Sequence, residues 1–147
     1  MTRATRSRAE ATTRWIRQLL FALEAVVAVS AVAGATYGLA GAEDVPPEWL
    51  EGTPFDSYTI PSLILLVAVG GGMGAAALAQ LARHSRAAEL AITAGLILVG
   101  WIVVQVVIIV PDGGFSWLQP AMLAVGALVA ALGVRLRRER RPAGRVA

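Results

Sequence analysis

The sequence has no cysteine and no lysine, a single histidine and few charged residues. Without cysteine the chain can form no disulfide, iron–sulfur cluster or thiol nucleophile, and one histidine cannot complete a zinc site of the usual composition. We therefore expect no metal and no cofactor. Only 16% of the 147 residues are charged, against about a quarter in soluble domains. Since 56% are hydrophobic and the mean hydropathy is +0.65, an ordinary soluble domain is excluded.

The apolar residues form four blocks, at about residues 16–40, 58–81, 90–110 and 117–134. A helix needs about 20 such residues to span a membrane, and in lipid only helices or closed barrels satisfy their backbone hydrogen bonds. The alternation of barrel strands is absent. An arginine-rich start before an apolar run also describes a secretory signal, but the first block is longer than the 7 to 15 residues of a signal core, so we expect it to be retained. The sequence predicts an all-α polytopic membrane protein, one domain over residues 1–147 with an antiparallel bundle of four transmembrane helices.

All thirteen positive charges are arginines, and they lie on one side of this arrangement. Five lie before or at the start of the first block, two lie between the second and third, and six follow the fourth. All the charged residues of the other two connections are acidic. Because positive charge near helix ends stays in the cytoplasm, both termini are predicted to be cytoplasmic, with residues 41–57 outside, in the cell (inner) membrane.

The two ends of the chain, residues 1–14 and 137–147, contain too little apolar surface to pack alone. We expect these arginine-rich tails to be disordered or to lie on the lipid bilayer, where anionic lipids are a further partner. Neither tail interleaves aromatic residues with its arginines, so nucleic acid is not an expected partner.

Two glycine patterns predict close helix packing, because small residues let helix backbones approach one another in lipid. Gly34 and Gly38 form a GxxxG pair in the first block. Gly70 and Gly74 belong to a denser patch in the second block. Counted from the helix centres, the two patches lie at different depths, so we expect them to face different partners.

Glu24 is the one ionisable residue well inside a predicted span. A carboxylate near a helix centre costs about 2.5–3.5 kcal/mol on insertion scales, so Glu24 is expected to face the bundle interior in protonated form. No cation is level with it, since Arg17 lies two turns away. A structural role favours a hydrogen bond to a backbone carbonyl or to Thr93, beside glycines that include Gly95. A proton-binding or ligand-binding role is the alternative.

The outer half of the bundle holds the other predicted interior polar group, Gln105, which lies one turn from Trp101 and on the same helix face. An interhelical hydrogen bond is its simplest role.

The loop 41–57 is the only connection long enough to hold structure. Pro47 suits the first position of a helical turn and Gly52 its end, which would lay Trp49 and the following leucine on the membrane surface. Its five carboxylates lack the ligand spacing of a calcium loop.

Three segments together carry a resemblance to a known family: Trp49 to Tyr58 followed by Ile60 and Pro61, Trp101 to Gln105, and Trp117 to Pro120. Over nearly the whole chain the sequence resembles a family of small uncharacterised four-helix membrane proteins from GC-rich bacteria, although Ser62 stands where that family has glycine. The resemblance implies a bundle with both termini inside. It also groups the loop residues Trp49 and Phe55 with Gln105 and Gln119, so we expect the loop to fold back as a lid over these glutamines.

The residues favour an accessory or structural role in the membrane, with no enzymatic activity, because no nucleophile and base, metal cluster or paired carboxylates converge. Such a role leaves a homo-oligomer or a hetero-oligomer open. The alternative is a proton-coupled small-molecule transporter that uses Glu24, since small multidrug transporters also have four helices and a glutamate in the first. Their aromatic and glycine patterns are not found here.

Overall fold

The computed structural model describes residues 3–109 and 117–140, and within these ranges the chain is helical, with no strand. Four helices of this part are long and apolar enough to cross a membrane, as predicted. The elements are α1 (Arg3–Leu39), the 3-10 helix η1 (Pro47–Leu50), α2 (Thr59–Ile64), the π-helix η2 (Leu65–Gly71), α3 (Gly72–Leu81), α4 (Ala87–Val104), the π-helix η3 (Gln105–Ile109) and α5 (Leu118–Arg140). Two predicted helices thus contain a π-helical segment, with wider turns, that the apolar pattern did not indicate.

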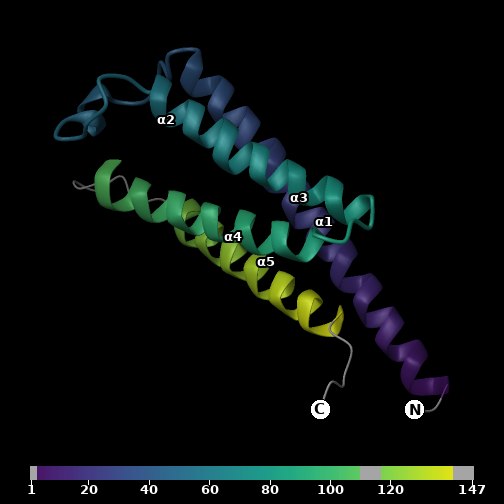
Figure 1. Cartoon of the computed structure of the whole chain (residues 1–147). Helices are drawn as coiled ribbons and strands as arrows, with labels where there is room; N and C mark the ends of the chain where they lie inside the picture. The colour runs from purple at the N-terminus through teal and green to yellow at the C-terminus, as the bar shows by residue number, and fades with distance from the viewer. Residues whose placement is uncertain (1–2, 110–116, 141–147) are drawn as a thin grey trace.

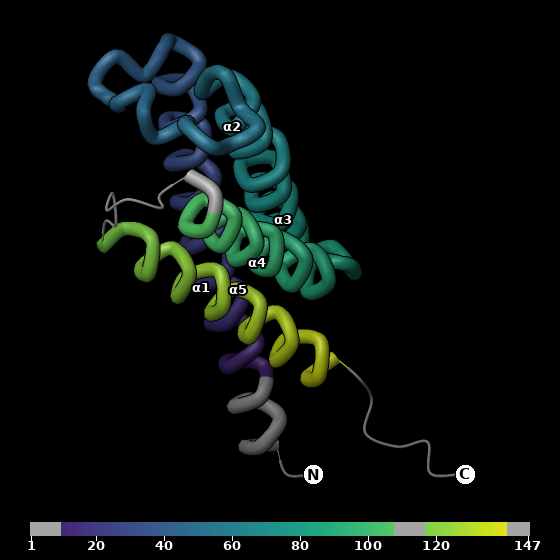
Figure 2. The backbone as a smooth tube through the Cα atoms, turned by 90° about the vertical axis from the view of Figure 1, so that its left-hand side faces the viewer, coloured from purple at the N-terminus to yellow at the C-terminus, as the bar shows by residue number. Residues whose placement is uncertain are grey.

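The helices form two antiparallel hairpins (Figure 1). In the first, α1 packs along α2, η2 and α3, and in the second, α4 packs along α5. The turn at residues 82–86 joins the hairpins, and α1 also contacts α5. We call the end with this turn, the start of α1 and the end of α5 the arginine end. The opposite end, where the loop 41–57 arches over the helices, is the loop end (Figure 2).

Three glycines bring the backbones of α4 and α5 into contact. A methyl group at Gly95 would lie 2.6 Å from the Gly126 carbonyl oxygen and 2.7 Å from the Ala130 nitrogen. One at Gly133 would lie 3.0 Å from the Ala88 carbonyl oxygen. Gly95 therefore packs against α5, not beside Glu24 as predicted. The spacing of Gly126, Ala130 and Gly133 was a small-residue signal that the sequence analysis missed.

The first hairpin also closes through glycines. A methyl group at Gly38 would overlap the Ser62 hydroxyl of α2, and one at Gly34 would lie 3.3 Å from the Leu65 side chain. Gly70 faces α1 in return, because its methyl group would lie 3.5 Å from Cβ of Ala31. The prediction that the two patches face different partners is thus wrong for Gly70, which shares the interface of Gly34 and Gly38. It holds for Gly72 of the same patch, where a methyl group would lie 3.9 Å from the Ile97 side chain of α4. Gly74 has no packing role, because a methyl group there would meet nothing within 4 Å.

Two helices, α1 and α5, extend further at the arginine end than predicted. α1 begins at Arg3 rather than near Ile16, because the preceding residues contain no proline or glycine and extend an existing helix at little cost. Thr13 of this extension donates a hydrogen bond of 2.9 Å to Glu139.

At the same end, α5 continues to Arg140, six residues past its predicted limit at residue 134. Arg140 donates to the Ser85 carbonyl oxygen over 2.7 Å, and Arg137 lies 3.7 Å from Glu89. Residues 3–14 and 137–140 are thus helical rather than disordered, because the extensions find polar partners on neighbouring elements. The rest of the predicted C-terminal tail, and residue 110 of the third predicted helix, lie outside the described residues.

The contact between α4 and α5 predicts the effect of adding one methyl group. We expect Gly95→Ala to destabilise the protein by about 1–3 kcal/mol, because the new methyl group would meet backbone atoms that can yield only if the helices separate. Gly100→Ala is the matched control in the same helix, where a methyl group meets nothing within 4 Å, and its higher helix propensity adds up to about 1 kcal/mol. Denaturant titration in detergent measures both, and equal stabilities of the two variants would contradict the assignment.

Candidate functional site

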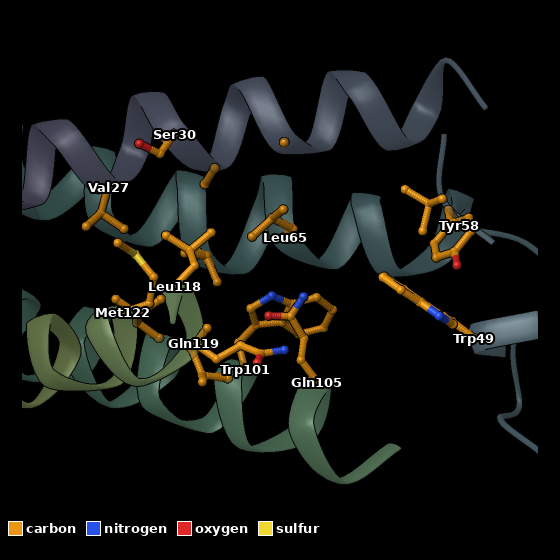
Figure 3. Close-up of a pocket in the computed structure, with 16 residues that line it drawn as sticks. Val27, Ser30, Trp49, Tyr58, Leu65, Trp101, Gln105, Leu118, Gln119 and Met122 are labelled. Atoms are coloured by element: carbon orange, nitrogen blue, oxygen red, sulfur yellow. The ribbon is translucent and has the colours of Figure 1, made fainter. Parts of the chain in front are cut away.

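A cavity of about 570 Å³ lies at the loop end between the two hairpins (Figure 3). This volume lies within the range of small-molecule sites, about 300–1,000 Å³. We call it the loop-end cavity. All four membrane-length helices and the loop contribute to its wall. The lining residues are Val27, Ser30, Ala31, Gly34, Val45, Trp49, Tyr58, Leu65, Val69, Leu98, Trp101, Ile102, Gln105, Leu118, Gln119 and Met122. Among the described residues of this wall there is no carboxylate, histidine or arginine.

The cavity brings together three of the predicted polar and aromatic residues of the helices. Trp101 and Gln105 come from α4 and the first residue of η3, one turn apart, and Gln119 comes from the first turn of α5 (Figure 3). Trp101 is 7% exposed, and its indole Nε1 is buried with no hydrogen-bond partner within the described part of the chain. A buried donor without a partner costs about 1–3 kcal/mol, so this group can stabilise an acceptor placed beside it.

The loop closes the cavity at the loop end. The predicted helical turn is present as η1, which begins at Pro47, and Gly52 after it has a positive φ of 78°. Trp49 lines the cavity together with Val45, so part of the loop folds back over the glutamine side of the bundle as predicted. Leu50, the last residue of η1, is buried and not on the membrane surface as predicted.

Phe55 does not belong to the cavity, so its predicted grouping with the glutamines is wrong. Its backbone N–H donates to the Thr53 hydroxyl over 3.2 Å, and that hydroxyl in turn donates to the Leu50 carbonyl oxygen over 2.7 Å. These local bonds complete the chain reversal after η1. The Phe55 side chain is half-buried.

Two tyrosines, Tyr37 and Tyr58, fasten the loop to the helices. The Tyr58 hydroxyl donates to the Pro46 carbonyl oxygen over 2.8 Å, and the Asp44 N–H donates to the Tyr37 hydroxyl over 3.3 Å. Burial raises the pKa of Tyr58 above its ordinary value of 10.0, and the negative charge of Glu48 raises it further. The Tyr58 hydroxyl therefore remains a donor at neutral pH and holds the loop over the cavity.

Glu24 lies outside the cavity lining, one turn from Val27, which lines it. It is fully buried, and neither carboxyl oxygen has a hydrogen-bond partner within the described residues. Its polar neighbour is Gln80 of α3, which is also buried and whose Oε1 likewise has no partner, while its Nε2 donates to the Ala87 carbonyl oxygen over 3.3 Å. Thr93, the predicted partner, is exposed.

The pairing of Glu24 with Gln80 has a simple chemical requirement. Two acceptor oxygens cannot bond to each other, but a protonated carboxyl group can donate to the free amide oxygen. Gln80 escaped the sequence analysis because it stands at the end of an apolar block, where a polar residue marks a boundary.

The hydrogen bond from the Tyr58 hydroxyl to Pro46 should limit the mobility of the loop. We expect Tyr58→Phe to speed hydrogen exchange in residues 45–53 by about two- to tenfold. This is the effect of losing one hydrogen bond, which contributes about 0.5–1.5 kcal/mol. Tyr37→Phe is the matched control and should change exchange less, since its bond is longer. Because the pKa of Tyr58 is raised, its contribution is complete below pH 10 and disappears as the pH rises through the raised value. Unchanged exchange in Tyr58→Phe would show that the loop is held by other contacts.

The chain matches no protein-family model, no curated protein and no solved structure. The two ends of the bundle differ in chemistry: one carries the arginines, and the other carries the loop with its carboxylates (Figure 1).

Proposed function

We propose that this protein is a multi-pass protein of the cell membrane with a non-enzymatic accessory role. The loop-end cavity carries this proposal, because the described residues of its wall are apolar or uncharged and include no acid, histidine or cation that could transfer protons to a substrate. The exposed faces of the helices support insertion in a membrane. Val29, Val67 and Val107 are each 70% exposed, which is costly in water and favourable in lipid.

Both termini are proposed to lie in the cytoplasm. The start of α1, the turn at residues 82–86 and the end of α5 gather at one end of the bundle and carry the arginines (Figure 1). Positive charge near helix ends is held on the cytoplasmic side, so the loop end faces outward. Membership of the small four-helix family, and binding of anionic lipid by arginines at the arginine end, remain predictions.

Single cysteines test this orientation directly, since the chain has none of its own. Ser57 lies in the loop and Ser85 in the turn at the arginine end, and both are exposed. We expect an impermeant maleimide to label Ser57→Cys in intact cells and to label Ser85→Cys only after the cells are opened. The reverse pattern would overturn the topology and the proposed function with it.

A proton-coupled transporter is the second candidate, favoured by the complete burial of Glu24 without a hydrogen-bond partner among the described residues. Buried acids inside membrane helices commonly mark proton or substrate pathways. Glu24 lies one turn from the cavity lining, so a proton on it and a molecule in the cavity would be neighbours. If the Glu24–Gln80 pair is instead structural, an uncharged amide should be able to replace the acid.

Replacing Glu24 separates the two roles. If the acid is structural, Glu24→Gln keeps a donor for the Gln80 Oε1 and should match the wild type in stability, whereas Glu24→Leu leaves that oxygen unpaired and costs about 1–3 kcal/mol. Denaturant titration in detergent measures this difference. Proton flux in reconstituted vesicles, driven by cationic substrates, is the second measurement. Flux in the wild type that vanishes in a stably folded Glu24→Gln variant would establish the transporter instead.

A further inference from the structure

We infer that the loop-end cavity holds the acyl end of a neutral membrane lipid, with the carbonyl oxygen of its ester beside Trp101. The inference rests on the proposed function, because it requires the bundle to lie in a membrane. The cavity volume of about 570 Å³ suits one such molecule rather than a second protein chain. Four observations carry the inference: the open edge of the cavity, its lack of charge, the unpaired indole donor and the position of the π-helices.

The cavity opens sideways, toward the surface that lipid would cover. Ser30 and Gly34 of α1 and Leu118 of α5 line the cavity and are exposed, so the edge between these two helices is open. The surface around this edge is apolar, with Val26 65% exposed and Leu123 39% exposed. At the loop end Val45 and Trp49 also line the cavity, and Trp49 is 41% exposed. An acyl chain in the surrounding lipid can therefore reach the interior through the apolar edge.

The polar groups of the wall select the head of this molecule. Among the described residues of the wall none is charged, so a phosphate or a carboxylate placed there would be buried without a counter-charge from them, at a cost of several kcal/mol. The unpaired Trp101 indole N–H can only donate, so it requires an acceptor. Gln105 and Gln119 lie in the same wall and can both donate and accept (Figure 3). A neutral ester carbonyl meets these requirements.

Both π-helices contribute to the wall at this level. Leu65 and Val69 belong to η2, and Gln105 begins η3. π-helical turns are rare and are frequently found at functional sites, because the wider turn moves side chains out of the regular α-helical register. In Figure 3 the Leu65 side chain projects from η2 toward Trp101 and Gln105 across the cavity. The irregular turns thus shape the cavity from opposite hairpins.

Binding of tritiated monooleoylglycerol to the purified full-length chain in detergent tests the inference. We expect saturable binding of one molecule per chain, competed by unlabelled monooleoylglycerol and far less by octadecane, which lacks the carbonyl group. Trp101→Phe keeps the ring and removes the N–H, so affinity should fall about three- to tenfold, the effect of one hydrogen bond. Trp117→Phe is the matched control, since Trp117 is 77% exposed and outside the wall, and should bind normally. Leu65→Trp should fill the cavity and abolish binding.

Three results would overturn the inference: no saturable binding by the folded wild type, equal competition by octadecane, or unchanged affinity in Trp101→Phe. Circular dichroism and elution as a single species show whether each variant is folded. The cysteine labelling at Ser57 and Ser85 is independent of this assay. A protein with the expected labelling that binds no monooleoylglycerol loses the lipid site alone, whereas a reversed labelling pattern removes the proposed function whatever the binding result.

Discussion

The contact of two helix backbones at Gly95 and Gly126 is the constraint on which the rest of this bundle depends. Apolar helices in lipid gain nothing from hiding apolar surface, so close van der Waals packing must hold them together. At this contact the distance between backbones is too small for a methyl group, as it is again at Gly133 one heptad later. α4 and α5 are thereby fixed along each other as one hairpin. In the first hairpin, Gly38 of α1 makes room for the Ser62 side chain of α2, and Gly70 of η2 lies at ordinary contact distance from α1.

Because each hairpin is tight within itself, the space between the hairpins is where a cavity forms, and this cavity is the proposed site. At the arginine end the two meet through buried side chains, and the polar contacts of Thr13 with Glu139 and of Arg140 with Ser85 join α1, α5 and the turn. At the loop end the hairpins enclose the cavity instead. The loop covers it with Trp49, fastened by the Tyr58 hydroxyl. Glycine packing and charge thus divide the molecule into a closed end and a hollow end.

The number of long helices followed from the sequence, because block length and the lack of charge are local properties. The helical turn at Pro47 was also predicted. The grouping of Trp49, Gln105 and Gln119 was predicted too, and these residues lie at the same end of the antiparallel bundle. The partners of the glycines did not follow, since rotation of each helix about its axis depends on its neighbours. For the same reason Gln80, and not Thr93, lies beside Glu24. The π-helices could not be predicted from the sequence, because one widened turn barely changes the pattern of a helix that is apolar on all sides.

The separation of the buried acid from the cavity bears on the choice between the two functions. A proton-coupled transporter needs a group that proton and substrate reach in turn, so that one displaces the other. Glu24 is sealed within the bundle, faces Gln80 and is absent from the cavity wall. A molecule in the cavity touches the side of Val27, one turn away, and competes with no proton. To couple the two, α1 would have to turn about its axis, which would break the close contacts of Gly34 and Gly38 with α2 and η2. The glycine packing of the first hairpin therefore opposes coupling and favours a protein that holds its molecule in place.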